Sequence, residues 1–518
     1  MSAGRPKPDP QSATASTRDG RSPGGGPGTF DVVVVGAGSA GCVLAARLSE
    51  RPGRTVLLVE AGPDHRVDTM PDELRHLSRP VAWPYNWGDK VASTAGRMLN
   101  YARGRGVGGS SATNGAVAMR PEPEDFASWP EGMRWERMLP YLNRIEDDLD
   151  FGDDPHHGNA GPIPIVRHPE AEWSPLQRGF VDGCLAEGLP LCADHSRPGS
   201  TGVGPIPMNR RGTRRVSNTV AYLDPARARP NLTVRGDAHV RRVLLTGGRA
   251  VGIELADGER IYAGRVVLSA GVVQNPLLLW RSGVGPAHGV SGLGIEPVHE
   301  LPAVGAGLSD HMVVSYRAAV RPDAVPDGGP TLQTIARATA RPDQGRTHDL
   351  QLTPVARRNP DGTREIEISV ALQLPNGFGS IVPTGAAPDA PARISWPFTT
   401  DRDNLERLAI GVRLAARVVA ASGLALAPDA VSRVSDMPDD VLCLSFAASH
   451  YAFYHGVGTC RIGIDPAAGV VDAELRVHGL SGLHIVDASV VPTVPRANTH
   501  LLATALGELG AELIAAAD

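Results

Sequence analysis

Short apolar runs separated by a glycine-rich turn define the stretch from residue 30 to residue 60. Residues 31–35 form a β-branched run, which is typical of a strand buried on both faces. Residues 40–48 show helical spacing, with Leu44 and Leu48 one turn apart. Residues 55–59 form a second apolar run. The pattern predicts a strand, a helix and a second strand, in that order.

Three glycines lie between the first predicted strand and the helix, with the spacing GxGxxG. Gly36 allows a tight turn, Gly38 lets backbone approach a pyrophosphate, and Gly41 lets helix and strand pack closely. Glu60 ends the second strand, where an acid can hydrogen-bond an adenosine ribose. A glycine turn without a binding role is disfavoured, because the two predicted strands, the helix and the acid all occur in the order that a dinucleotide-binding unit requires. The stretch predicts dinucleotide binding and leaves FAD and NAD both open.

Further alternating and periodic segments extend this αβ character along the chain. Residues 129–148 have helical spacing, as do residues 404–421. Predicted strands cover residues 231–234, 239–245, 250–255, 265–271 and 365–372, and Asp257-Gly258 marks a turn.

An acidic run covers residues 147–154 and is followed by His156 and His157. Carboxylates beside histidines can bind a metal, but a solvated loop is the favoured interpretation. We therefore expect no metal in this protein.

Composition restricts the class of protein. A chain of 518 residues has room for a large core, which we expect to be divided into two domains. Its content of 42% apolar and 21% charged residues is ordinary for a globular protein. A net charge of −5 gives no reason to expect nucleic acid or an anionic membrane as a partner. No apolar run is long enough for a membrane span.

Cysteine usage and the N-terminal residues bear on location. The five cysteines show neither a CxxC pair nor metal-ligand spacing, so we expect reduced thiols, with Cys42 buried, and a cytoplasmic protein. Residues 1–29 lack the apolar core of a secretion signal, and their Gly, Pro, Ser and charge content predicts a disordered tail.

A second glycine-rich segment runs from Tyr101 to Arg120 and reads YARGRGVGGSSATNGAVAMR. Such a backbone-rich segment suits close approach to a flat or charged ligand. A flexible linker is the second interpretation, because residues 116–119 continue as an ordered apolar run.

The C-terminal part contains candidate chemistry. His455 begins the run HGVGTCR, and Asp487 ends the apolar run 484–486, where an open α/β sheet binds ligands. A neutral histidine is suited to taking a proton from a reacting group. Any one of the 16 histidines, taken alone, is more often structural than catalytic.

Taken together, these motifs resemble the glucose–methanol–choline (GMC) oxidoreductases, a family of FAD-dependent alcohol oxidases and dehydrogenases. The resemblance rests on the first glycine segment with Glu60, on GRGVGGSSATNG, on residues 272–286 and 301–311, and on the C-terminal segment. It implies an α/β fold, in which a Rossmann-like FAD-binding domain is interleaved with an α+β substrate domain built on an antiparallel sheet. Two residues depart from the usual family pattern: Pro121 stands where a glycine is usual, and Gly456 stands where a proline is frequent.

The resemblance also implies a division of the chain. Residues 30–311 would form the FAD-binding domain, with part of residues 121–200 as a lid or substrate-side insertion. Residues 312–449 would bind substrate, and residues 450–518 would return to the FAD domain with the catalytic residues.

The family's roles carry over to particular residues. His455 would be the base and Asn498 its hydrogen-bonding partner, with His500 as a rival for that second role. Some relatives attach FAD to a histidine that matches Thr113, so the resemblance implies non-covalent FAD. The implied cofactor-binding residues are Gly36, Gly38, Ser39, Ala40, Gly41, Glu60, Ala61, Arg105, Val107, Gly108, Gly109, Ser110, Asn114, Gly115, Ala116, Val117, Val240, Ala270, Asp487, Ala488, Asn498, Thr499 and His500.

The expected function is therefore FAD-dependent oxidation of an alcohol to an aldehyde or ketone, with hydride transfer to the flavin N5. The alternatives are non-redox or light-driven chemistry on the same fold, as in the family's hydroxynitrile lyase and fatty-acid photodecarboxylase, or a flavin-binding sensor. Retention of both His455 and Asn498 disfavours the sensor. The partner would be a small alcohol, with O₂, a quinone or another carrier as electron acceptor; the sequence leaves the oligomeric state open.

Overall fold

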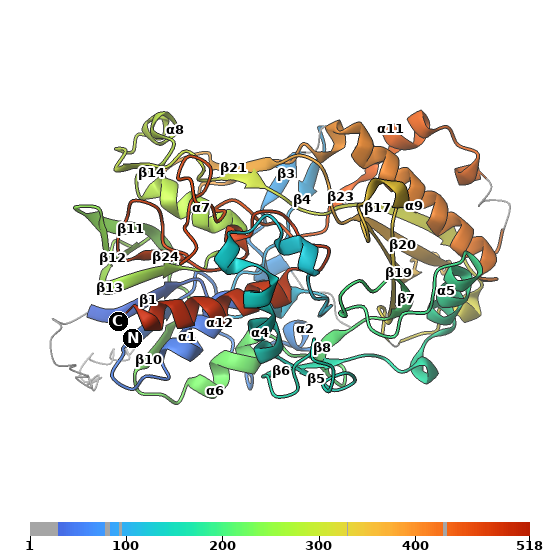
Figure 1. Ribbon diagram of the computed structural model, residues 1–518, viewed down its shortest axis with the longest axis horizontal. Coiled ribbons are helices and arrows are strands. Elements are labelled where there is room, and N and C mark those ends of the chain that lie inside the picture. The colour runs from blue at the N-terminus through green and yellow to red at the C-terminus, as the bar shows by residue number, and fades with distance from the viewer. Residues whose placement is uncertain (1–28, 78–82, 93–95, 329, 428–432, 518) are drawn as a thin grey trace, which may run out of the picture.

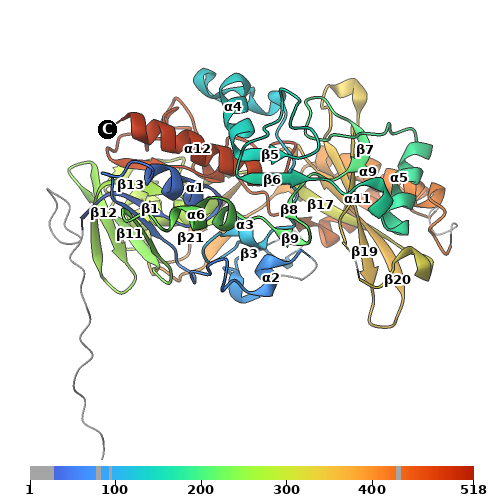
Figure 2. The same ribbon diagram turned by 90° about the horizontal axis from the view of Figure 1, so that it is seen from below.

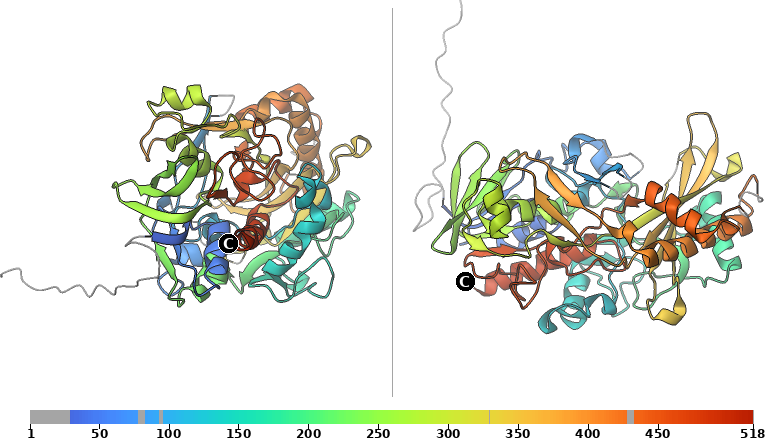
Figure 3. Two further views of the ribbon diagram at one scale, coloured as in Figure 1. Left: turned by 60° about the vertical axis from the view of Figure 1, so that its left-hand side comes forward. Right: turned by 90° about the horizontal axis from the view of Figure 1, so that it is seen from above.

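The computed structural model describes residues 29–77, 83–92, 96–328, 330–427 and 433–517. The predicted tail therefore lies outside the described residues, apart from residue 29. Two large sheets lie toward opposite ends of the long axis, and the C-terminal helix α12 (His500–Ala516) runs along the first of them (Figure 1). Figure 2 and Figure 3 give the same arrangement from other sides.

The first sheet has seven strands and contains the predicted strand–helix–strand unit. Its order is β10-β2-β1-β13-β12-β11, with β24 paired to β13. Val32 to Val35 are all buried, which confirms the strand buried on both faces. Helices α1 (Ser39–Leu48) and α12 pack against each other. The strands are β1 (Thr29–Val35), β2 (Val56–Val59), β10 (Leu232–Arg235), β11 (Val240–Thr246), β12 (Arg249–Leu255), β13 (Arg260–Leu268) and β24 (Leu483–Ile485).

The second sheet has six strands in the order β23-β17-β20-β19-β18-β7, and every pairing in it is antiparallel. One of its faces is apolar and packs on helix α9 (Arg402–Ala421). The strands are β7 (Gly202–Pro205), β17 (Met312–Ala319), β18 (Thr334–Ala338), β19 (Leu350–Arg358), β20 (Arg364–Leu372) and β23 (Tyr451–Ala452). Strands β7 and β23 join it from outside residues 312–449.

Smaller elements connect the two large sheets. A five-stranded sheet has the order β16-β21-β22-β3-β4, a four-stranded sheet the order β5-β6-β8-β9, and β14 pairs with β15. Their strands are β3 (Lys90–Ala92), β4 (Met98–Asn100), β5 (Glu146–Asp148), β6 (Ile163–Val166), β8 (Met208–Arg211), β9 (Arg214–Arg215), β14 (Val284–Gly285), β15 (His299–Glu300), β16 (Ala306–Leu308), β21 (Gly379–Pro383) and β22 (Ala392–Ser395). The remaining α-helices are α2 (Asp72–Arg75), α3 (Ser110–Thr113), α4 (Trp135–Ile145), α5 (Pro175–Ala186), α6 (Asp224–Ala226), α7 (Gly271–Arg281), α8 (Ala287–Gly292) and α11 (Asp439–Ser449).

Most predicted elements are confirmed within two residues, including the strands at 231–234, 250–255 and 365–372 and the helix at 404–421. The helix predicted over residues 129–148 is wrong at both ends, because α4 covers only Trp135–Ile145. Glu146 is extended, and residues 146–148 pair with β6 as strand β5. Inter-strand hydrogen bonds to β6 therefore replace the last turn that helical spacing had indicated.

Two further expectations concerned the state of the cysteines and the lack of a membrane-spanning segment. All five cysteines are buried free thiols, and burial raises the pKa of Cys42 to about 12. Among the described helices, none has the length and apolar character required to cross a membrane.

Replacing Gly41 by alanine tests the close contact between α1 and β1. A methyl group on Gly41 would lie 1.9 Å from the carbonyl oxygen of Gly36, whereas one on Gly53 would meet nothing within 4 Å. We expect Gly41→Ala to lower the free energy of unfolding by about 1–3 kcal/mol, because the backbone at Gly41 and Gly36 must move apart to admit the methyl group. Gly53→Ala is the control. Equal thermal unfolding midpoints for the two variants would contradict this packing.

Candidate active site

A cavity of about 490 Å³ is lined by residues of both large sheets, both glycine-rich segments and the C-terminal segment. Eighteen of the residues expected to bind the cofactor border it: Gly36, Gly38, Ser39, Ala40, Glu60, Ala61, Gly109, Ser110, Asn114, Gly115, Val117, Val240, Ala270, Asp487, Ala488, Asn498, Thr499 and His500. Segments separated by more than 400 residues thus meet at one cavity.

Five residues expected at the cofactor do not border the cavity. Gly41 packs against the turn at Gly36, and the Gly108 N–H donates to the Ala37 carbonyl at 2.7 Å. Val107 and Ala116 are buried, and the Arg105 guanidinium lies 5.2 Å from the centre of the Trp87 ring. These residues shape or flank the two glycine segments.

The first glycine turn has the geometry that a pyrophosphate requires. Gly36 has a φ of 96°, and a methyl group there would lie 2.6 Å from the Ser269 carbonyl oxygen. Gly38 is open, because a methyl group on it would meet only that same oxygen, at 3.9 Å. No side chain caps the N-terminus of α1, and Ser39 and Ala40 at this end border the cavity, so free backbone N–H groups are available to a ligand there.

Glu60 joins the glycine segments in a way that the sequence did not indicate. Its carboxylate accepts hydrogen bonds from the backbone N–H groups of Ala37 at 2.9 Å, Gly62 at 3.0 Å and Gly106 at 3.1 Å. Burial raises its pKa, while these three donors oppose the shift. Glu60 therefore fixes the two turns beside the cavity, in addition to bordering it.

Asp487 has a comparable position at the end of β24. Its carboxylate accepts from the Gly271 N–H at 2.7 Å, the Asn275 side-chain amide at 2.8 Å and the Ser489 N–H at 2.8 Å. The strand-terminal acid thus holds the start of α7 against the C-terminal segment.

Two histidines form a hydrogen-bonded pair at the other end of the cavity. The Nδ1 atoms of His311 and His455 lie 2.8 Å apart, and His311 Nε2 lies 2.8 Å from the Pro495 carbonyl oxygen. His455 Nε2 lies 3.0 Å from the side-chain nitrogen of Asn498. The structure thus brings together the two predicted catalytic residues and adds His311, which the sequence did not single out.

The available donors and acceptors determine which ring nitrogen of each histidine carries a proton. A carbonyl oxygen only accepts, so His311 carries its proton on Nε2 and donates it to Pro495. Burial lowers the pKa of His311 to about 4, so its Nδ1 is an unprotonated acceptor at neutral pH. His455 must then donate from Nδ1, which leaves a lone pair on its Nε2. The Asn498 amide N–H points at that lone pair.

Burial, together with nearby His311 and Arg103, holds the pKa of His455 well below its ordinary value. The imidazole is therefore neutral at physiological pH. A neutral ring with a bare Nε2 at a cavity wall is the form that accepts a proton.

The backbone around His455 is held from several sides. The His455 N–H donates to Asp310 at 2.9 Å, and the Tyr101 hydroxyl donates to the same carboxylate at 2.8 Å. Burial raises the pKa of Asp310 to about 6, although Arg103 opposes this. Tyr454 has a φ of 65°, a conformation that costs a non-glycine residue energy. The adjacent contacts hold that strained residue in place.

His500 lies apart from this pair. Its Nδ1 is 3.4 Å from the Ser39 hydroxyl at the start of α1, and burial lowers its pKa to about 4. It sits where α12 begins beside the first glycine turn. Contact with His455 therefore favours Asn498 over His500 for the second catalytic role.

The residues present fit a bound FAD. The open side of Gly38 and the uncapped α1 N-terminus suit a pyrophosphate. Asn498 Oδ1 beside His455 and His500 Nε2 near the first glycine turn are both buried without a hydrogen-bond partner among the described residues. Buried polar atoms without a partner are costly, so these atoms are suited to a polar ligand.

Comparisons with known proteins agree with this geometry. The GMC oxidoreductase family patterns match residues 30–313 and residues 375–507. The chain therefore belongs to the GMC oxidoreductase family. It is a FAD-dependent enzyme that acts on CH–OH groups.

Individual relatives span almost the whole chain. The chain is 34% identical to 5-(hydroxymethyl)furfural oxidase from Methylovorus sp., covering 94% of this chain and 98% of the relative. It is 34% identical to pyridoxine 4-oxidase from Microbacterium luteolum, with coverage of 92% and 98%. The solved pyridoxine 4-oxidase from Mesorbium loti is 30% identical and superimposes with a TM-score of 0.84, covering 93% of this chain and 98% of its own.

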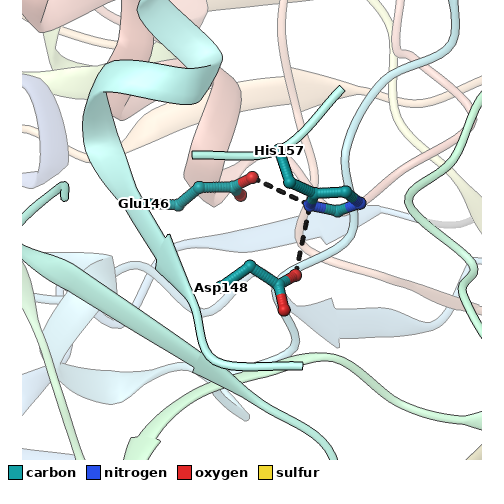
Figure 4. Close-up of side chains that lie close together, drawn as sticks. All are labelled: Glu146, Asp148 and His157. Carbon is teal, nitrogen blue, oxygen red and sulfur yellow. Dashed lines mark hydrogen bonds and ion pairs between the residues drawn. The ribbon is translucent and has the colours of Figure 1, made fainter. Parts of the chain in front are cut away.

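A second buried cluster lies outside the cavity, at the acidic run. His157 Nδ1 lies 3.0 Å from Glu146 and 3.1 Å from Asp148, and both carboxylates face the same side of its ring (Figure 4). His157 Nε2 contacts Asp194 at 2.9 Å. Asp148 and His157 are buried, so the predicted solvated loop is wrong for these two residues. Pairing with opposite charges is what makes their burial possible.

The charges of this cluster balance without a metal. Arg120 pairs with Glu146 at 2.8 Å, and Arg167 pairs with Asp148 at 2.8 Å and Asp194 at 2.9 Å. Burial alone would lower the pKa of His157, but hydrogen bonds to the carboxylates raise it to about 11. Three buried anions thus meet two arginines and an imidazolium, while the more exposed Asp150 also lies 3.3 Å from Arg167. A protonated imidazole does not coordinate a metal.

Replacing His157 by glutamine tests this ion-pair cluster. We expect His157→Gln to lower the free energy of unfolding by about 3–5 kcal/mol at pH 6, because buried carboxylates lose their counter-charge. The folded pKa is raised, so the contribution is complete below about 6.5 and disappears as pH rises toward about 11. The difference from wild type should therefore shrink between pH 6 and pH 10 in thermal unfolding.

The neighbouring half-exposed His156, which among the described residues pairs with Asp154 alone, gives the control variant His156→Gln. Its effect should be below about 1 kcal/mol. A chelator should leave the wild-type unfolding midpoint unchanged; a midpoint lowered by the chelator would contradict a metal-free cluster.

Proposed function

We propose that the protein oxidises a small alcohol to the aldehyde or ketone, with His455 as the base at Nε2. The observation that carries the proposal is the hydrogen-bonded chain from the Pro495 carbonyl through His311 and His455 to Asn498. This chain leaves one unprotonated imidazole nitrogen at the wall of the cavity that also borders both glycine segments.

In the proposed reaction the alcohol loses a proton from its hydroxyl group and a hydride from its carbon. The substrate hydroxyl gives its proton to His455 Nε2, the C–H bond breaks with its electron pair, and the C=O bond forms. FAD, when bound, supplies the two-electron acceptor for that hydride. The Asn498 amide N–H can then hold the substrate oxygen as negative charge develops on it.

Asn498 suits both protonation states of His455. With Nε2 bare, the amide N–H donates to it at 3.0 Å. Once Nε2 carries a proton, rotation of the amide brings Oδ1 into position as an acceptor. That oxygen is buried and has no partner among the described residues. His311 Nδ1 accepts from His455 throughout, so the ring keeps its orientation.

We propose further that FAD is held without a covalent bond. Thr113 borders the cavity where some relatives carry the histidine that attaches the flavin, and a threonine hydroxyl is a poor substitute for it. The electron acceptor is O₂ or a quinone-type carrier, and comparing peroxide formation with reduction of an artificial dye separates the two. The polar cavity wall formed by Gln351, Thr353 and Ser369 disfavours a fatty-acyl substrate, and with it photodecarboxylation.

Anaerobic mixing of the purified holoprotein with a panel of primary and secondary alcohols tests the reaction. At least one alcohol should bleach the oxidised flavin spectrum and yield its carbonyl product, and His455→Ala should slow bleaching by about 10²–10⁴-fold. Cyanohydrin cleavage without bleaching would select the lyase alternative. Persistent oxidised flavin with every alcohol would reject alcohol oxidation.

Replacing His311 by phenylalanine tests its role in positioning the His455 proton. Without the Nδ1 acceptor, the His455 proton can move to Nε2, so we expect bleaching to slow by at least about 10²-fold. The pH dependence should change as well, since wild type loses activity only below the ordinary histidine pKa of about 6.5. His311→Gln, which retains an acceptor, should recover part of the rate.

His450→Phe is the matched control for this variant. His450 is equally buried, but its Nδ1 bonds only to the carbonyls of Phe446 and Ala447 in the preceding helix. Wild-type bleaching and pH dependence in His311→Phe, with flavin content unchanged, would remove His311 from the mechanism.

A further inference from the structure

We propose that the polar face of the antiparallel sheet binds a second hydroxyl group of the substrate, so that the enzyme prefers small, uncharged diols. The inference deepens the proposed function and rests on it. It concerns the cavity wall formed by Gln351, Thr353, Ser369 and Tyr451.

The two faces of this sheet differ sharply in chemistry. Along β20 the apolar side chains point to α9, where Gly411 lies against Val370 and Leu350. The opposite face carries Ser369, with Thr353 and Gln351 on the neighbouring strand β19. These three side chains are only 9%, 7% and 3% exposed. A polar face that is buried against a cavity, instead of exposed to bulk solvent, indicates a ligand.

Strand register aligns three hydroxyl groups on that face. Thr353 of β19 pairs directly with Ser369 of β20, which pairs directly with Ser315 of β17. The Tyr451 hydroxyl, on the edge strand β23, lies 2.9 Å from the Ser369 hydroxyl and 3.2 Å from that of Ser315. The result is a continuous row of hydroxyls across the sheet.

Glu367 determines the direction of the hydrogen bonds along this row of hydroxyls. Its carboxylate can only accept, so the Ser315 hydroxyl donates to it, at 2.6 Å. Ser315 must then accept from Tyr451, and Tyr451 must accept from Ser369. The Ser369 proton is therefore used within the row, and its lone pairs are what it offers to the cavity.

Thr353 offers the complementary group. Its oxygen accepts from the Gln351 amide at 3.4 Å, and its own O–H has no acceptor among the described residues. An acceptor at Ser369 and a donor at Thr353 thus stand opposite each other on paired strands. A hydroxyl group, which both donates and accepts, satisfies the two together.

Charge at this wall favours an uncharged substrate. The Glu367 carboxylate already pairs with the guanidinium groups of Arg317 and Arg357. Arg103, which also borders the cavity, stacks on the Tyr101 ring and donates to the Tyr454 carbonyl. Its Nε and Nη2 have no hydrogen-bond partner among the described residues, but its charge is offset by the nearby buried Asp310 carboxylate. No unpaired carboxylate at the described wall can therefore receive a cationic alcohol.

The distance to His455 limits the size of the substrate. Tyr451 precedes His455 by four residues in one segment, so their backbones are at most about 13 Å apart. A single ring or a short chain with hydroxyl groups at both ends is therefore the expected form.

Matched alcohols test this inference on the holoenzyme. The probes are 1,4-benzenedimethanol and 4-ethylbenzyl alcohol, which differ by one hydroxyl in place of a methyl, with 4-(hydroxymethyl)benzoate and choline as charged alcohols. We expect kcat/KM for the diol to exceed that for the ethyl compound about tenfold, the effect of roughly one satisfied hydrogen bond. Both charged alcohols should react more slowly than the diol.

Variants of the wall assign the preference to particular residues. Ser369→Ala and Thr353→Val should each bring the ratio of the two kcat/KM values close to one. Ser395→Ala, an exposed serine on β22, should leave the ratio as in wild type. Flavin content and thermal unfolding check that each variant is folded.

A binding measurement separates failure of this inference from failure of the proposed function. In His455→Ala holoprotein, where bleaching should be slow compared with binding, the rapid flavin absorbance change reports binding, and the diol should bind about tenfold more tightly than the ethyl compound. Equal binding and equal kcat/KM, or preference for a charged alcohol, would overturn the diol assignment alone. If no alcohol bleaches wild-type flavin, the oxidation proposal fails. The binding comparison then still tests whether the polar wall binds a second hydroxyl group.

Discussion

Parallel pairing of β24 with β13 is the constraint on which the active site depends. It joins Leu483 to Val266 and Ile485 to Leu268, and so brings the C-terminal segment to the carboxyl end of the strand next to β1. Asp487 follows at once and is bound to the start of α7. From there the chain runs past the cavity wall to α12, which packs on α1. One short strand thus determines that the glycine turn and Asn498 face the same cavity.

Local pattern was sufficient to predict most strands of the first sheet but not their order, because the strands are short apolar runs and the first turn requires glycines at fixed spacing. The close contact at Gly41 and the open side of Gly38 follow from spacing alone. Helical spacing failed at residues 146–148, since pairing with β6 depends on residues that are distant in sequence. The seven-stranded sheet mixes a parallel βαβ part with antiparallel β11 and β12. The predicted turn at Asp257-Gly258 is confirmed between β12 and β13, but the antiparallel pairings were not predicted.

The site was predictable only in part. His455 and Asn498 were identified through a family resemblance, and their 3.0 Å contact agrees with it. The role of His311 was not visible, because it depends on the Pro495 carbonyl and on a contact across 144 residues. The row of hydroxyls on the second sheet likewise depends on strand register. The buried charges around His157 looked like a solvated loop because sequence does not reveal their arginine partners.

The central claim is that resting His455 carries its proton on Nδ1 and presents a bare Nε2 to the cavity. Nitrogen-15 NMR of the histidine rings in oxidised holoprotein tests this directly, with the His455→Ala spectrum assigning the signals. The account predicts a neutral ring with Nδ1 protonated, and loss of that fixed state in His311→Phe. A His455 ring protonated on Nε2, or charged at neutral pH, would contradict it.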